Sequence, residues 1–203
     1  MSQTRLRFVK TTDAERIAAI YAEYCRSSPA TFEIEPPAIS QIKARIEKTM
    51  NVFPWLVIEE REIVRGYAYA GQHRERAAYR WSADVSVYIE NGYQHRGFGK
   101  ALYTPLLALL TELGFYNAFA GITLPNDGSV GLHRAMGFTA AGIFRNVGFK
   151  LNRWHDVQWW HKQLKEPVAN SIEPAEPLLL RSLALRECQD RAALVGLLDE
   201  LSG

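Results

Sequence analysis

The sequence predicts an α/β (α+β) fold in which a mixed central β-sheet is flanked by helices. Apolar, β-branched runs typical of strands alternate along the chain with segments whose apolar residues recur at helical spacing. Two of the strand-like runs, 54–59 and 63–70, are joined by a short charged turn, which is a β-hairpin signal. Two later runs, 85–89 and 117–123, are each followed by a helix-like segment, and this order indicates parallel neighbours within the sheet.

The remaining elements follow from start and stop signals. A helix is expected from about Asp13, because Thr12 and Glu15 have the spacing of a capping box, and Pro29 ends it. Ser40 is expected to cap a second helix. The order is therefore βααββ, then βα, βα and ββ. The expected strands are 6–9, 54–59, 63–70, 85–89, 117–123, 138–150 and 154–165, and the later helices begin at 40, 101 and 129.

The stretch from Asp84 to Leu102 combines a strand, a basic glycine-spaced loop and a helix start. Gly97 and Gly99 have no Cβ, so an anion can approach the main chain closely. The helix start adds free N–H groups and the positive end of the helix dipole. The junction predicts a site for a phosphate-bearing ligand, although an ordinary strand-to-helix turn would use the same glycines. The positive side chains of the loop are those of His95, Arg96 and Lys100.

Composition suits one globular domain with a core of ordinary size: 203 residues, 47% hydrophobic and 23% charged. A net charge of +2 is too small to indicate nucleic-acid binding. No run approaches the roughly 20 apolar residues that span a bilayer, and the N-terminus lacks an apolar signal core. Cys25 and Cys188 form no C-x-x-C pair and are expected to be reduced thiols. We therefore expect a cytoplasmic protein that binds neither nucleic acid nor membrane.

Several motifs of other enzyme classes are absent from the sequence. It has no G-x-x-x-x-G-K-[ST] phosphate loop, no G-x-S-x-G nucleophile elbow and no H-E-x-x-H pair. The five histidines are scattered, so no metal is expected.

Nine short segments follow one another along most of the chain. They are P-A-T-F-E (29–33), P-W-L-V (54–57), G-Y-A-Y-A-G (66–71), A-Y-R-W (78–81), V-S-V-Y-I (85–89), L-P-N-D-x-S-V-x-L-H (124–133), G-F (137–138), G-x-K (148–150) and R-W-H-D-V (153–157). In this order they resemble the phosphinothricin N-acetyltransferase branch of the GNAT superfamily, from Pro29 to about Leu164. The spacing Gln94-x-x-Gly97-x-Gly99 resembles the acyl-CoA pyrophosphate loop of that superfamily.

The resemblance implies the GNAT acyl-CoA N-acyltransferase fold, with a splay between the fourth and fifth strands, acetyl-CoA as co-substrate and a homodimer. It implies that the free strand edge pairs with pantetheine amides. A backbone N–H of Val87 or Tyr88 is expected near the thioester carbonyl, where negative charge develops. The expected cofactor-binding residues are Val87, Tyr88, Ile89, Gln94, His95, Arg96, Gly97, Phe98, Gly99, Lys100, Asn126 and Ser129.

Two residues are expected to be catalytic. Asp84 matches the position of a glutamate base in related enzymes, and its shorter side chain favours proton transfer through water. It could instead be a strand-edge or capping carboxylate, and Glu90 is a weaker candidate base that is expected to face solvent. His133 is expected either to assist proton movement near the acetyl group or to be an ordinary core or surface histidine. Asn126 is expected to cap the short helix before His133 as well as to contact the cofactor.

Two arginines, Arg74 and Arg76, suit an α-carboxylate and a second oxygen-rich group, although they could form a solvated basic loop. The expected reaction is direct acetyl transfer to the α-amine of a small amino-acid-like substrate, of the phosphinothricin, methionine sulfoximine or methionine sulfone type. The alternatives are a GNAT enzyme for a polyamine, an aminoglycoside or a peptide N-terminus, and a weakly active acyl-CoA-binding module. The expected substrate-binding residues are Phe32, Arg74, Arg76, Tyr79, Val85 and Ser86.

The composition changes after residue 165. We expect the N-acetyltransferase (GNAT) domain to cover 1–165 and a linker rich in proline and glutamate to cover 166–177. Residues 178–203 are expected to form an amphipathic helical tail whose apolar face packs back on the domain or meets a partner.

Overall fold

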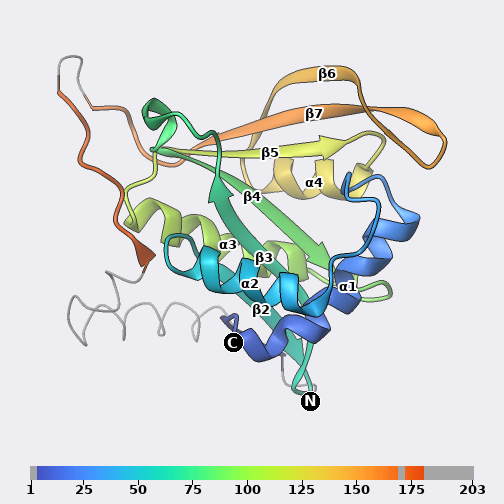
Figure 1. The fold of residues 1–203 in the computed structure, drawn as a ribbon. Helices are drawn as coiled ribbons and strands as arrows, with labels where there is room; N and C mark the ends of the chain where they lie inside the picture. The colour runs from blue at the N-terminus through green and yellow to red at the C-terminus, as the bar shows by residue number, and fades with distance from the viewer. Residues whose placement is uncertain (1–3, 169–171, 181–203) are drawn as a thin grey trace.

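The computed structural model describes residues 4–168 and 172–180. Seven strands form one mixed sheet in the order β1-β2-β3-β4-β5-β7-β6 (Figure 1). The predicted fold class and order of elements are confirmed. The strands are β1 (Thr4–Phe8), β2 (Trp55–Glu60), β3 (Ile63–Gln72), β4 (Ser82–Ile89), β5 (Asn117–Thr123), β6 (Thr139–Lys150) and β7 (Arg153–Gln163). The helices are α1 (Ala14–Ser27), α2 (Ile39–Met50), α3 (Phe98–Glu112) and α4 (Asp127–Ala135), with short 3₁₀ turns at Thr11–Asp13 and Ala77–Tyr79.

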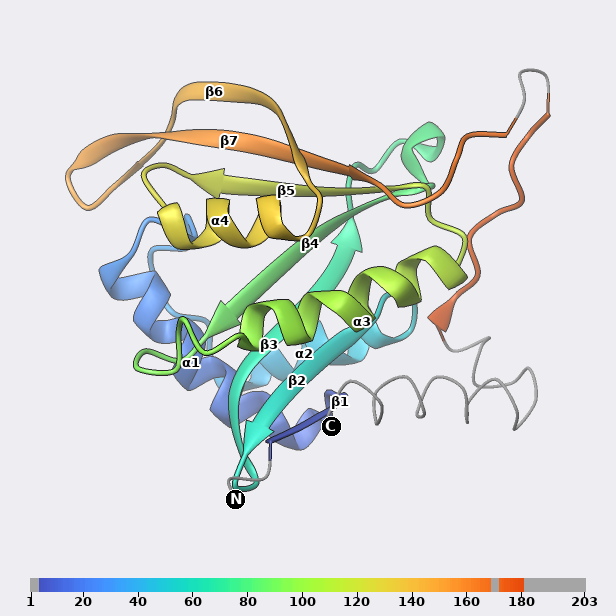
Figure 2. The same ribbon diagram turned by 180° about the vertical axis from the view of Figure 1, so that it is seen from behind.

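The helices cover both faces of the sheet. Figure 1 shows α1 and α2 on one face, and the reverse view in Figure 2 shows α3 and α4 on the other. None of the helices in the described part of the chain is long and apolar enough to cross a membrane.

The first helix begins near Asp13 as predicted, but two predicted capping residues are wrong and a later helix begins earlier than predicted. The predicted Thr12–Glu15 box does not form: Asp13 precedes α1 without a side-chain cap bond, and its Oδ2 accepts from the Lys10 N–H at 2.8 Å within the 3₁₀ turn Thr11–Asp13. Helix α2 begins at Ile39, before the predicted cap at Ser40, and the Ala38 N–H donates to the Gln41 side chain at 2.8 Å. Helix α3 begins at Phe98 instead of Ala101, so the end of the glycine loop is already the first helical turn.

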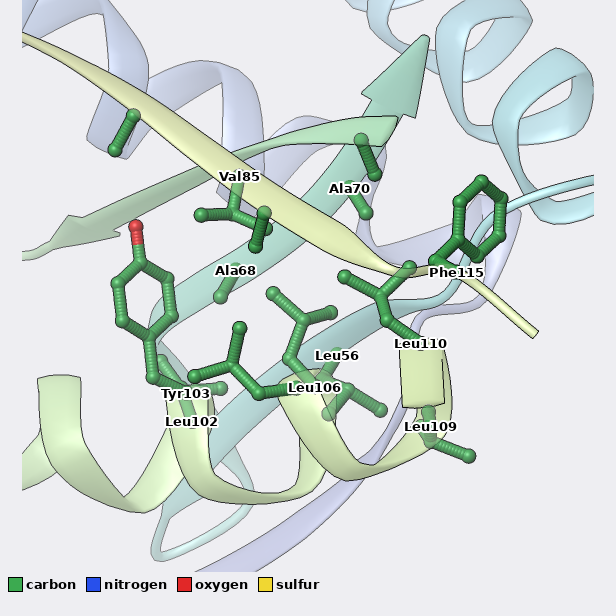
Figure 3. Close-up of a cluster of buried hydrophobic side chains, with 14 of the residues drawn as sticks. Leu56, Ala68, Ala70, Val85, Leu102, Tyr103, Leu106, Leu109, Leu110 and Phe115 are labelled. Atoms are coloured by element: carbon green, nitrogen blue, oxygen red, sulfur yellow. The ribbon is translucent and has the colours of Figure 1, made fainter. Parts of the chain in front are cut away.

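The main core lies between α3 and the sheet. Figure 3 shows the leucines of α3 packed on small and branched residues of β2, β3 and β4. Leu102, Leu106 and Leu110 are fully buried, and Ala68 opposite them is small enough for the helix to lie close to the strands. A buried leucine contributes roughly 1.5–3 kcal/mol, so this row of contacts fixes the N-terminus of α3 beside β4.

Strands β4 and β5 separate soon after they begin. Their parallel pairing joins Ser82–Asp84 to Asn117–Phe119 and then stops, and the two strands fan apart in Figures 1 and 2. The predicted splay between the fourth and fifth strands is therefore confirmed. Beyond it, β5 pairs with β7 along its whole length, so the main-chain edge left without a strand partner is that of β4.

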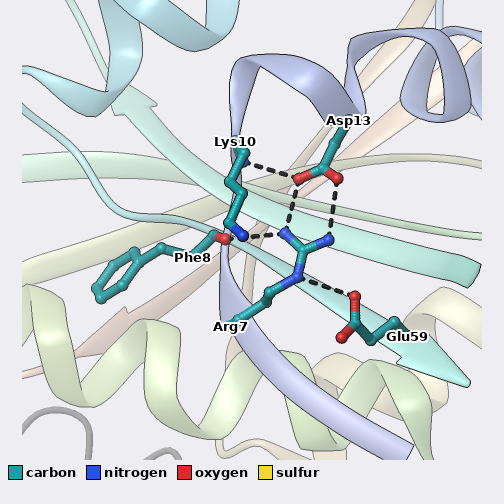
Figure 4. A network of polar contacts seen from close by, with 5 residues as sticks. All are labelled: Arg7, Phe8, Lys10, Asp13 and Glu59. Atoms are coloured by element: carbon teal, nitrogen blue, oxygen red, sulfur yellow. Dashed lines mark hydrogen bonds and ion pairs between the residues drawn. The ribbon is translucent and has the colours of Figure 1, made fainter. Parts of the chain in front are cut away.

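An ion-pair network fixes the opposite side of the sheet. Figure 4 shows the Arg7 guanidinium between two carboxylates. Its Nη1 and Nη2 donate to Asp13 at 2.7 and 2.9 Å, and its Nε donates to Glu59 at 2.8 Å. Burial raises the pKa of Asp13, but the bonds and charge of Arg7 and the Lys10 N–H outweigh it, so the pKa lies below its usual value. The network joins β1, β2 and the start of α1.

Residues 172–180 lie along the domain. The Trp81 Nε1–H donates to the Ala175 carbonyl at 2.9 Å, and the Leu178 N–H donates to the Leu113 carbonyl at 2.8 Å. The Leu180 side chain is buried. The segment predicted as a linker therefore contacts the domain where the structure describes it. Most of the predicted helical tail, 181–203, lies outside the described residues.

Candidate active site

A cavity of about 360 Å³ lies in the splay between β4 and β5. Its walls come from β4, the loop after β4, the first turns of α3, β5 and α4. The predicted site residues that line it are Val85, Ser86, Val87, Tyr88, Ile89, Gln94, His95, Gly97, Phe98, Gly99, Lys100, Asn126, Ser129 and His133. The predicted site residues outside this lining are Phe32, Arg74, Arg76, Tyr79, Asp84 and Arg96.

The N-terminus of α3 forms one end of the cavity. Gly97 is the N-cap residue and has φ +82°, a left-handed conformation that glycine adopts without strain. The N–H groups of Phe98, Gly99 and Lys100 follow in the first turn, where no helical carbonyl is available to them. These N–H groups and the Lys100 ammonium suit a diphosphate.

Two residues of this loop have additional structural roles. A Cβ on Gly99 would lie 2.9 Å from Leu132 Cδ2, so the glycine also lets α3 approach α4. The Arg96 guanidinium was expected to add charge to the anion site, but its Nη2 lies 2.6 Å from Glu60 Oε1. It also lies over the ring of Tyr93, 4.9 Å from the centroid. Its charge therefore meets a carboxylate of β2.

The β4 edge presents specific main-chain groups to the cavity. N–H directions alternate along an antiparallel strand. The Glu90 N–H donates to β3 at 2.8 Å, whereas the Ile89 N–H turns away from β3 and meets the Tyr24 hydroxyl at 3.3 Å. By this alternation the Val87 N–H points into the splay and the Tyr88 N–H points toward β3. Of the two donors left open by the sequence, Val87 has the direction that a ligand in the splay needs.

His133 and Tyr103 form a buried pair in the cavity wall. His133 is 2% exposed, its Nδ1 lies 2.8 Å from the Ser129 carbonyl, and its Nε2 lies 3.2 Å from the Tyr103 hydroxyl. Because a carbonyl only accepts, Nδ1 carries the proton and Nε2 accepts from Tyr103. Burial lowers the pKa of His133, which keeps the ring neutral near pH 7. Asn126 caps α4 as predicted, since its side chain accepts from the Ser129 N–H at 3.1 Å.

Asp84 lies on β4 where the splay begins. Its Oδ1 lies 2.6 Å from the Nδ1 of His73, and its side chain is 36% exposed. Burial raises the pKa of Asp84, while the hydrogen bond and charge of His73 and the charge of Arg74 lower it; the net effect is a rise. A carboxylate with a raised pKa is a better proton acceptor than an ordinary aspartate.

Glu90, the weaker candidate base, does not face solvent as expected. Its carboxylate is ion-paired with Arg16 and with Arg65, the latter at 2.8 Å. Burial raises its pKa, but hydrogen bonds and charge from the two arginines outweigh this and lower it. Two guanidinium partners make this carboxylate a poor base.

The predicted substrate residues come from three parts of the fold: the loop after α1, the connection between β3 and β4, and β4 itself. Arg74 and Arg76 are exposed on the loop between β3 and β4. The Tyr79 ring meets the His73 ring edge-on, with centroids 5.9 Å apart. Phe32 packs directly on Gly148 of β6, which leaves no room there for a side chain. Val85 is 4% exposed and belongs to the core, so only its main chain is open to a ligand.

The loop that carries Phe32 is held by a buried lysine. Lys150, at the end of β6, is 5% exposed. Its Nζ donates to the carbonyls of Ser28 and Thr31 at 2.8 and 2.7 Å, and reaches that of Tyr24 at 3.3 Å. Burial lowers the pKa of this ammonium. The lysine thereby joins the β6–β7 hairpin to the end of α1 and the loop after it.

The chain matches the acetyltransferase (GNAT) domain family over residues 6–159. It belongs to the GNAT acetyltransferase family. Among curated GNAT relatives, a phosphinothricin N-acetyltransferase from Streptomyces viridochromogenes is 37% identical over 80% of this chain and 89% of its own length. An L-methionine sulfoximine/L-methionine sulfone acetyltransferase from Salmonella typhimurium is 30% identical, over 81% of this chain and 96% of its own length.

A solved GNAT structure shares the fold closely. It is a phosphinothricin acetyltransferase from Sinorhizobium meliloti in complex with acetyl-CoA, with a TM-score of 0.81 and 34% identity, covering 88% of this chain and 99% of that one. In the present GNAT chain, the left-handed Gly97, the α3 N–H groups and the open β4 edge fit such a co-substrate. Within the described residues, no group of three histidine, cysteine, aspartate or glutamate side chains is placed to hold a metal ion.

Sequence reasoning missed several residues of this GNAT site. Tyr103 lies four positions after Gly99, which places it one turn along the same helix face, and this spacing could have identified it. His73 could have been found only from the β3–β4 register, which pairs Gly71 with Asp84. Lys150 belongs to the G-x-K motif of the resemblance, but its role and that of Tyr24 depend on partners far away along the chain, so neither role could be predicted locally.

Proposed function

We propose that this GNAT enzyme transfers the acetyl group of acetyl-CoA to the α-amine of a small amino-acid-like acceptor of the phosphinothricin, methionine sulfoximine or methionine sulfone type. One observation carries the proposal: the α3 N-terminus and the unpaired β4 edge line a single cavity, and a carboxylate with a raised pKa lies where that cavity's two strands separate. The relatives named for phosphinothricin and methionine sulfone acetylation support this class of acceptor.

Each part of the cavity has a distinct role in this reaction. The N–H groups of Phe98–Lys100 and the Lys100 ammonium bind the diphosphate of the co-substrate. The β4 edge aligns its pantetheine arm by main-chain hydrogen bonds. The Val87 N–H donates to the thioester oxygen as negative charge develops there during attack by the amine. Asn126 and Ser129 contact the co-substrate at the start of α4.

Proton transfer uses two separate groups. Asp84 accepts a proton from the acceptor ammonium through an intervening water, because the carboxylate lies outside the cavity lining. On the opposite side, the Tyr103 hydroxyl and His133 form the polar pair in the cavity wall. The departing thiolate takes the second proton of the attacking amine nitrogen as the tetrahedral intermediate collapses, and the Tyr103 hydroxyl stays bonded to His133 in the cavity wall.

Arg74 and Arg76 bind the anionic groups of the acceptor. Both guanidinium groups are exposed, and no ion pair joins either to another described residue. We expect Arg74→Ala and Arg76→Ala each to raise the KM for phosphinothricin by roughly tenfold or more, because a charge-assisted hydrogen bond contributes about 1.5–3 kcal/mol. The KM for acetyl-CoA should not change. Steady-state kinetics would measure both, with Arg5→Ala as the control because Arg5 is exposed on β1, at the other side of the sheet.

An acetyl-transfer assay tests the function directly. The release of free CoA thiol would be followed with phosphinothricin, methionine sulfone and methionine sulfoximine, and with spermine, an aminoglycoside and a peptide as the competing acceptor classes. We expect turnover with the first group, and mass spectrometry should find the acetyl group on the α-amine. Turnover with spermine alone would contradict the acceptor assignment, and binding of acetyl-CoA without any transfer would indicate a binding module.

We also propose that the enzyme is a cytoplasmic homodimer assembled through the β6–β7 hairpin. β6 is an edge strand of the sheet, and an edge with an apolar face suits pairing with a second copy. Size-exclusion chromatography with light scattering would measure the oligomeric state. The exposed apolar residues of the hairpin are Ile143, Phe144, Val147, Phe149, Leu151 and Trp154.

A further inference from the structure

His73 immediately follows β3 and contacts the carboxylate assigned as the base. Its Nδ1 lies 2.6 Å from Asp84 Oδ1, and its side chain is 10% exposed. An ionised carboxylate can only accept, so Nδ1 carries the proton in this bond. The other oxygen, Oδ2, makes no hydrogen bond to the described residues and remains available to a water or a substrate.

The imidazole ring is fixed by aromatic contacts. It stacks on the Phe119 ring with centroids 4.3 Å apart and an interplanar angle of 16°. The rings of Tyr79 and Trp159 meet it edge-on at 5.9 and 6.0 Å. Packing on three rings opposes rotation of the imidazole, so Nδ1 stays directed at Asp84.

We propose that His73 is a positioning residue for acetyl transfer, which holds one oxygen of the Asp84 carboxylate so that the other faces the acceptor amine. This inference rests on the proposed function, and it adds a residue that acts through Asp84. Tyr79 and Phe119, which bracket the ring, belong to the β3–β4 connection and to β5, so the arrangement is built where the two strands begin to separate.

The hydrogen bond between His73 and Asp84 also predicts the direction in which the pH dependence of the rate changes when it is removed. Besides each other, the carboxylate and His73 face the charged or titratable side chains of Arg74, Tyr69 and Tyr79, and His161 stacks on Phe119, the ring on which His73 lies. Burial raises the pKa of Asp84, and the His73 bond is the largest of the opposing influences. Removing it should raise that pKa further. A protonated carboxyl cannot accept a proton, so the acid limb of the rate profile should move to higher pH.

Two substitutions separate positioning from packing. His73→Phe keeps an aromatic ring to stack on Phe119 but removes the donor, whereas His73→Asn restores an N–H close to the Nδ1 position. We expect His73→Phe to lower kcat by about tenfold or more, within the range of general-base effects, with an unchanged KM for acetyl-CoA. Its acid limb should shift upward. His73→Asn should recover most of kcat, and the midpoint pH of its acid limb should lie close to the wild-type value.

The measurement is kcat and kcat/KM for the acceptor between pH 5 and 9, on protein whose folding is checked by circular dichroism. The proposal would be overturned if the acid limb of His73→Phe had the same midpoint pH as that of the wild type. It would also be overturned if His73→Phe and His73→Asn lost the same fraction of kcat and neither acid limb moved. If His73→Phe does not fold, His73→Gln takes its place, because its amide lies near the Nε2 position and does not reach Asp84. His73→Asn must then exceed His73→Gln in rate for the proposal to stand.

The same experiment distinguishes this inference from the function on which it rests. If the wild-type protein transfers no acetyl group to any acceptor, the proposed function is wrong. If the wild-type protein is active and Asp84→Asn is inactive, but His73→Phe has unaltered kinetics, only the role of His73 is wrong.

Discussion

Replacement of Asp84 by alanine is expected to lower kcat by roughly 10²- to 10⁴-fold, the usual contribution of a general base. Its carboxylate lies at the beginning of the splay, outside the lining of the cavity, so the contacts made to acetyl-CoA remain. Isothermal titration calorimetry should therefore give an unchanged affinity for acetyl-CoA. The wild-type rate should fall on acidification at a pH above the ordinary aspartate value, because the pKa of Asp84 is raised, chiefly by burial.

Two control variants make this experiment specific. Asp84→Asn keeps the size of the side chain and should be almost as inactive as the alanine variant. Glu90→Gln should retain turnover within a few-fold, because the Glu90 carboxylate is engaged by Arg16 and Arg65. Normal turnover in Asp84→Asn would exclude the aspartate as the base, and a collapse in Glu90→Gln would favour the rival carboxylate.

Replacement of Lys150 by methionine is expected to destabilise the fold by roughly 3 kcal/mol or more and to raise the KM values. The variant leaves the carbonyls of Ser28 and Thr31 without their buried donor, and unpaired buried polar groups cost about 1–3 kcal/mol each. The loop they belong to contributes Ala30 to the cavity wall. Urea denaturation would measure the free energy of unfolding, and steady-state kinetics would measure the KM for each substrate.

Lys43→Met is the matched control, since Lys43 is exposed on α2 and the same change there should cost less than about 0.5 kcal/mol. A Lys150→Met protein that unfolds at the wild-type urea concentration would contradict the structural role. A destabilised variant whose KM values stay normal would show that the loop holds its shape without the lysine.

The phosphate end of the site could be predicted from the sequence because its chemistry is local. Gly97 and the three N–H groups after it lie within one turn of chain, and the spacing of glycines and helix residues specifies that turn. The splay between β4 and β5 was predicted from the resemblance, because the residues of the two strands do not indicate where their pairing stops.

The acceptor end could not be derived in the same way. The partners of Arg96, Glu90, Asp84 and Lys150 come from distant elements, so their roles depend on sheet register. Arg96 was expected to meet an anionic ligand and meets Glu60 instead, because the order of the sheet brings β2 near the glycine loop. The sequence alone does not show whether a ligand phosphate or a protein carboxylate such as Glu60 will lie nearer to Arg96.

The contact between Trp81 and Ala175 joins positions 94 residues apart. Its near neighbours Arg80 and Glu176 form an ion pair beside it. The segment that carries Arg74 and Arg76 is thus joined at one end to Asp84, through His73, and at the other end to the backbone of 172–180, which contributes no residue to the cavity lining. If Arg74 and Arg76 bind the acceptor as proposed, substitutions in 172–180 are expected to alter the choice among amines and to leave the groups that bind acetyl-CoA in place.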